Sequence, residues 1–183
     1  MHEPVHLDFA IQARKAGLNQ LFISTQNHKT TFIKGSAHNQ EIQQMEISEK
    51  SIADYCSNLF EGMNRQIFNA PIDLLIEGFL YTEFSDLRPF QFISLYTILQ
   101  EGLKAVTDKK ILELSPKDII SKSKVYNLVN AIQFKELFGF DFIRDFNATP
   151  SELKLATDFY DEYLQYKERQ KTCRRIRISP TLG

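Results

Sequence analysis

The chain has 183 residues, of which 43% are hydrophobic and 25% are charged, and its formal net charge is -1. This length allows one domain with its own core, and the composition excludes a disordered or low-complexity chain. No stretch approaches the roughly 18 apolar residues of a membrane-spanning helix, and the near-neutral charge argues against nucleic-acid binding by the chain as a whole.

The first forty residues predict one helix and at most one small β-hairpin. A helix is expected over residues 3–16, because Gly17 stands in the position that commonly follows a helix end. Two short β-prone runs at 21–23 and 31–33 are joined by a polar segment, which favours a loose hairpin. Residues 35–40 are expected to form a loop.

The middle of the chain predicts two helices separated by a proline. The first, over residues 48–68, carries apolar side chains at helical spacing. Pro71 is expected to open the second, over 71–84, which is apolar nearly all round and should therefore be buried. Its apolar side chains are expected to pack against two stripes, formed by Tyr55, Leu59 and Met63 and by Phe92, Leu95 and Leu99.

Proline-containing start signals indicate three more helices. Arg88-Pro89 opens one, and Ser115-Pro116 opens the next. The Thr-Pro-Ser-Glu sequence at 149–152 is a capping box, and it predicts a last helix that ends near residue 175. The chain has no Gly- or Ser-rich linker. The fold is therefore predicted to be mainly α: a compact multi-helix domain with at most one small hairpin.

The domain is expected to span residues 1–178, followed by a tail over 179–183. Residues 164–183 are basic, with six Lys and Arg against one Glu. Cations near a helix end complement its dipole, and this interpretation is preferred to a nucleic-acid or membrane contact. The chain starts without a secretory signal, and its two cysteines suggest no disulfide framework, so a cytoplasmic location is expected.

His2-Glu3-Pro4-Val5-His6 is an HExxH motif. On a helix, residues four apart share a face, so the two imidazoles can reach one zinc ion. Zinc lowers the pKa of a bound water from about 16 to about 7. The glutamate beside the first histidine is placed to take the proton that such a water gives up.

From His2 to Phe9 the sequence resembles the active-site helix of the HExxH zinc metallopeptidases, the zincins. The resemblance implies that His2 and His6 bind Zn²⁺ and that Glu3 is the general base. It also implies hydrolysis of a peptide or protein substrate by zinc-activated water. The metzincin pattern would place a histidine where Gln12 stands, so the resemblance favours the gluzincin type, in which an acidic residue on a later helix completes the site.

The predicted helix over 71–84 offers two acidic residues for that role. Asp73 and Glu77 lie four apart on an otherwise apolar helix, and buried carboxylates are costly unless they are paired or bind a metal. Glu77 is the predicted third ligand, and Asp73 is predicted to accept a hydrogen bond from a ligand histidine. The alternative is that both carboxylates face solvent or pair with Arg65 or Arg88.

Several features keep a second interpretation open. Zincins carry a β-sheet and a helix before the active-site helix, so this chain is interpreted as the C-terminal part of a metallopeptidase-like domain that is inactive alone. Pro4 should hold the first turn loosely. His28 and His38, both expected in loops, are alternative third ligands. The competing hypothesis is a non-enzymatic helical protein-interaction module with an accidental or decayed HExxH.

Overall fold

The computed structural model describes residues 2–17, 23–37 and 48–178, with the side chains of the last helix described as far as Glu168. These ranges contain helices and no strand, which confirms the predicted all-α fold. Residues 21–22 of the predicted hairpin and the predicted tail lie outside them. Among the described helices, none combines the length and apolar character that a membrane span requires.

Within the described ranges, seven α-helices and two 3-10 turns follow one another along the chain. They are α1 (His2–Lys15), α2 (Gln26–Ala37), α4 (Glu49–Glu83), η1 (Ser85–Leu87), α5 (Arg88–Thr107), α6 (Lys109–Leu114), α7 (Lys117–Phe138), η2 (Ile143–Phe146) and α8 (Pro150–Ile178).

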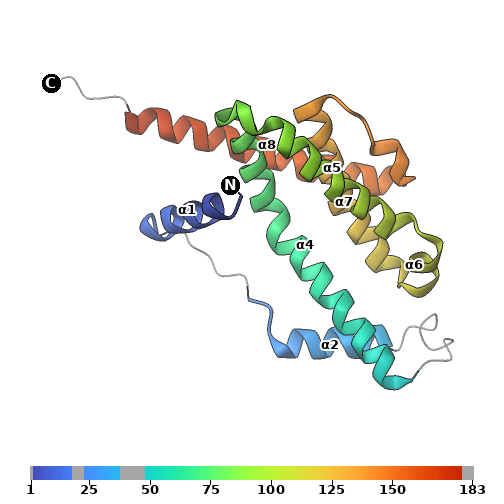
Figure 1. Cartoon of the computed structure of the whole chain (residues 1–183). Coiled ribbons are helices and arrows are strands. Elements are labelled where there is room, and N and C mark those ends of the chain that lie inside the picture. The colour runs from blue at the N-terminus through green and yellow to red at the C-terminus, as the bar shows by residue number, and fades with distance from the viewer. Residues whose placement is uncertain (1, 18–22, 38–47, 179–183) are drawn as a thin grey trace.

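The main body consists of α4, α5, α7 and α8. Helix α7 lies at its centre and packs against the other three helices (Figure 1). Its residues Leu128, Val129 and Ala131 are completely buried, and Phe134 nearly so. Helix α2 lies against the N-terminal part of α4, whereas α1 lies beside its C-terminal part. Helix α4 therefore connects the main body to the two N-terminal helices.

Helix α4 runs through Pro71 without a break, so the prediction of two helices at this point is wrong. Pro71 cannot donate a helical hydrogen bond, which costs about 3 kcal/mol inside a helix. Burial of Ala70 and Leu74 on either side of the proline offsets this cost. Because residues 55–63 lie on the same helix as residues 75–80, the predicted packing between these two stretches is also wrong.

Helix α2 replaces part of the predicted hairpin, because the β-prone run at 31–33 is helical. At its start the backbone N–H of His28 donates to the Thr25 hydroxyl at 3.3 Å, and the Thr25 N–H donates to the His28 ring at 3.4 Å. The Phe32 ring packs on Phe60 of α4, with centroids 5.4 Å apart. This cap and this contact outweigh the local β propensity.

The capping box at the start of α8 is confirmed. The Glu152 N–H donates to the Thr149 hydroxyl at 3.2 Å, and the Thr149 N–H donates to the Glu152 carboxylate at 2.8 Å. The buried carboxylate also accepts from the Ser121 hydroxyl at 2.7 Å and lies 3.5 Å from the Lys124 ammonium. Glu152 therefore ties the start of α8 to α7.

Acid is expected to remove the contribution of Glu152 to stability. Burial alone would raise the pKa of this carboxyl group, but hydrogen bonds from Thr149 and Ser121, with the charge of Lys124, hold the pKa below its ordinary value. The contribution is therefore complete above the unfolded pKa of about 4.3 and is lost as the pH falls through the lower folded value.

The measurement is urea unfolding of the wild type and of Glu152→Gln across this pH range. At neutral pH the variant should lose about 1–2 kcal/mol, the usual size of a helix-cap loss, and the difference should shrink in acid. Glu162→Gln, at an exposed position of the same helix, is the control and should show no such trend. A difference that stays constant with pH would contradict the prediction.

Candidate metal centre

Helix α1 packs on α4 through a small apolar contact. Val5 is buried in a cluster with Ile76 and Leu80 of α4. Beside it, the Phe9 ring meets the edge of the Phe79 ring at a centroid distance of 6.0 Å. This contact turns the face of α1 that carries both motif histidines toward α4.

Two histidines of α1 meet two carboxylates of α4. The His2 ring places Nδ1 2.8 Å from Glu77 Oε1 and Nε2 3.1 Å from Asp73 Oδ1. His6 Nε2 also lies 3.1 Å from Asp73 Oδ1. Both pairs are spaced by four residues, so each pair occupies one face of its helix. Each ring nitrogen of His2 therefore faces a carboxylate oxygen, one of Glu77 and one of Asp73.

His2, His6 and Asp73 each offer one ligand atom, and these three atoms lie within 4.8 Å of one another. Zinc bonds of about 2.0–2.1 Å in a tetrahedral site separate ligand atoms by about 3.3 Å. The two histidine–Asp73 separations of 3.1 Å are close to that value. Two imidazoles and one carboxylate are also the donors that zinc accepts, so the residues present fit this ion.

The site is open to solvent. The side chains of His2, His6 and Asp73 are 33%, 27% and 40% exposed, whereas that of Glu77 is 11% exposed. An ion can therefore reach the three candidate ligand atoms without any rearrangement of the core. Glu77 lies deeper, on the side of the cluster that faces α5.

Gln91 of α5 holds Glu77 in place, and sequence reasoning missed it. Its side-chain N–H groups donate to the Glu77 carboxylate and, at 2.9 Å, to the Glu77 backbone carbonyl. Gln91 is buried. A buried glutamine that donates both to the carboxylate and to the backbone carbonyl of one residue fixes the position of that carboxylate. The only sequence signal was a polar residue in the first turn of an apolar helix.

The other predicted site residues are placed as follows. Glu3, the predicted base, is exposed on the first turn of α1. Arg88, one of the alternative partners of the carboxylates, donates instead to the Tyr81 carbonyl at 2.9 Å and lies over the Tyr81 ring. His28 is exposed in the first turn of α2 rather than in a loop, and His38 lies outside the described residues.

Comparisons with known proteins give no assignment. No family model matches the chain, and no significant match is found among curated proteins or among solved structures. The geometry of the cluster therefore carries the functional argument.

Proposed function

We propose that the chain binds a zinc ion through His2, His6 and Asp73 in a site of the peptide-hydrolysing type, and that the chain alone is inactive. The observation that carries the proposal is the convergence of three ligand atoms within 4.8 Å of one another. The HExxH spacing supports it independently, because it supplies two of these three ligands from one helix face.

In this proposal the two carboxylates exchange the roles expected from the sequence. Asp73 is the third ligand, since one of its oxygens lies 3.1 Å from both imidazoles. Glu77 accepts a hydrogen bond from the other nitrogen of His2, which orients the ring and makes it a better ligand. Gln91 in turn holds Glu77.

Three protein ligands leave one position of a tetrahedral zinc ion open, as in catalytic zinc sites. Zinc bound there would supply a water with a pKa near 7. Glu3 is exposed beside His2, where its carboxylate can accept the proton of a nearby water. The peptide substrate follows from the resemblance of residues 2–9 to the zincin helix.

Zinc titration by calorimetry tests the ligand set. We expect the wild type to bind one ion, and His6→Ala or Asp73→Asn to abolish measurable binding because each removes a ligand. Glu77→Gln should weaken binding by about 10- to 100-fold, the usual cost of losing a partner of a ligand histidine. Glu3→Gln should bind zinc as the wild type does, because Glu3 is not a ligand.

Asp54→Asn is the control, since Asp54 is an exposed carboxylate on the same helix, and it should leave the affinity unchanged. If Glu77→Gln abolished binding while Asp73→Asn did not, Glu77 would be the ligand. If His6→Ala bound zinc as well as the wild type, no site would exist here. The helical interaction module would then be the surviving interpretation.

A fluorogenic peptide library tests the hydrolytic part of the proposal. The chain alone is expected to be inactive, so any zinc-dependent cleavage that is observed should be lost in Glu3→Gln, although that variant retains its zinc affinity. Zinc-dependent cleavage that persists in Glu3→Gln would contradict the role of Glu3 as the general base.

A further inference from the structure

One face of helix α5 carries large apolar side chains that no described element covers. Phe90 is 71% exposed, the largest value among the large hydrophobic side chains of the described residues, and Ile93 is 63% exposed. Thr97 continues this stripe, because residues spaced by three and then by four positions share one face of a helix. Helix α5 lies on the outside of the main body (Figure 1), so the stripe is accessible to another molecule.

Two aromatic side chains widen the stripe on one side. Tyr96 is 38% exposed and Phe140 is 53% exposed. Both rings contact the ring of Phe92, at centroid distances of 6.1 Å and 5.6 Å. Together, Phe90, Ile93, Tyr96 and Phe140 form what we call the α5 patch. Contiguous exposed apolar surface is typical of sites of protein–protein contact.

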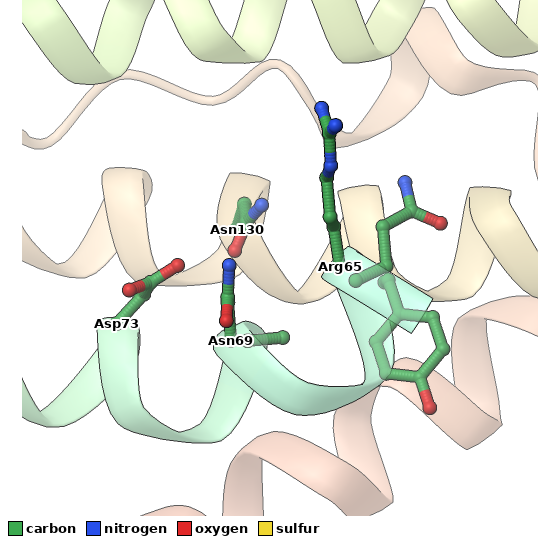
Figure 2. Close-up of a pocket in the computed structure, with 7 residues that line it drawn as sticks. Arg65, Asn69, Asp73 and Asn130 are labelled. Atoms are coloured by element: carbon green, nitrogen blue, oxygen red, sulfur yellow. The ribbon is translucent and has the colours of Figure 1, made fainter. Parts of the chain in front are cut away.

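The α5 patch is separate from the candidate metal centre. Gln91, which holds Glu77, lies on another face of α5 and is buried. The hollow beside Asp73 is lined by residues of α4 and α7 alone (Figure 2). A molecule bound to the patch therefore does not need to touch the side chains of the metal centre.

The charged side chains at the two ends of the stripe are complementary in an antiparallel arrangement. Asp86 precedes α5 and Lys104 lies in its last turn, and both are exposed. None of the ion pairs of the described residues involves either of them. They stand nine residues before and after position 95, about 13 Å along the helix axis on each side. When two α5 helices pack antiparallel about this position, Asp86 of each copy meets Lys104 of the other, and Ile93 of each copy faces Thr97 of the other.

The area of the α5 patch suits a weak dimer of this kind. With about 200 Å² for a large side chain, the exposed fractions give about 450 Å² of apolar surface per copy. Two copies with their polar surroundings therefore bury about 1,000 Å², the lower limit of a biological interface. We expect a dissociation constant on the order of 100 µM, so solutions of a few micromolar should contain the monomer.

We infer that the chain forms a two-fold symmetric dimer, in which the α5 patch of one copy packs against the α5 patch of a second copy. The self-complementary charges favour a second copy over an unrelated protein, because the acidic start and the basic end of the same stripe pair when the second helix runs in the opposite direction. This inference goes beyond the proposed zinc function and does not rest on it.

Analytical ultracentrifugation of the full chain, from about 5 µM to about 1 mM, spans the expected dissociation constant and tests the inference. We expect the wild type to change from monomer to dimer over this range. Ile93→Asp should be monomeric throughout, because it places two like charges near the symmetry axis. Ile98→Asp is the matched control, since Ile98 is 48% exposed on the same helix but lies about 140° around it from Ile93, and it should dimerise like the wild type.

Exchanging the charges at the ends of the stripe tests the antiparallel arrangement. Asp86→Lys alone, or Lys104→Glu alone, should weaken the dimer by about 3- to 10-fold, because each dimer contains two such pairs and both become repulsive. The double variant restores both pairs with reversed signs and should dimerise like the wild type.

The inference is overturned if the wild type stays monomeric up to about 1 mM, far above the expected dissociation constant, because the patch would then bind a different partner. It is also overturned if Ile98→Asp dissociates the dimer as Ile93→Asp does, or if the double charge variant is no stronger than the single variants. EDTA and a reducing agent in the buffer exclude association through a bound metal or a disulfide. These outcomes are therefore separate from success or failure of zinc binding.

Discussion

Replacing Phe134 by alanine is expected to lower the free energy of unfolding by about 3–5 kcal/mol. The side chain is 2% exposed and lies about one turn before the C-terminal end of α7. Its ring contacts Phe92 of α5 at a centroid distance of 5.3 Å, Phe138 at 5.0 Å and Phe142 at 5.8 Å. These rings come from three successive parts of the chain, so the surroundings cannot collapse to fill the cavity without moving several elements.

Phe90→Ala provides a matched control, because it is the same substitution at a side chain that is 71% exposed. Its free energy of unfolding should stay within about 0.5 kcal/mol of the wild type. Urea denaturation followed by circular dichroism measures both variants. Similar shifts of the unfolding midpoint in the two variants would contradict the assignment of Phe134 to the core.

Zinc is expected to stabilise the wild type by about 2.7 kcal/mol at a free concentration 100 times its dissociation constant, provided that only the folded chain binds. The increase in stability should be largest in α1. Among the described elements the main packing partner of α1 is α4, and the only buried side chain of α1 is Val5. Such a helix opens locally before the core unfolds. Hydrogen exchange of the α1 amides should therefore slow markedly when zinc is added.

His6→Ala supplies the comparison for this experiment. Without one of its ligands, the variant should show neither the rise in melting temperature nor the slower exchange in α1. Equal stabilisation of the variant and the wild type would place the ion elsewhere. So would protection that appears in α7 but not in α1.

The sequence predicted the fold class and most helices, because their signals are local. Gly17, which has a φ of 68°, ends α1, and the capping box starts α8 as expected. The wrong predictions concern segments whose secondary structure depends on contacts with residues far away in the sequence. Phe32 meets Phe60 only once α2 and α4 have packed, and Pro71 lies within α4 between the buried Ala70 and Leu74.

The sequence also identified the four side chains of the candidate metal centre, because each pair has a spacing of four residues. It could not say which carboxylate meets both imidazoles, since that depends on how α1 is rotated and shifted on α4. Gln91 was missed for the same reason. It comes from another helix, and it belongs to no motif.

The paired spacing has a consequence for the alignment of the two helices. Along α1 the order is His2 then His6, whereas along α4 their partners run in the opposite direction, from Glu77 to Asp73. A slip of α1 by one helical turn, about 5.4 Å, would leave one carboxylate without a histidine and would carry Val5 away from its apolar contacts. Only one register gives each of the four polar side chains a partner, so an ion bound to three of them would stabilise that register.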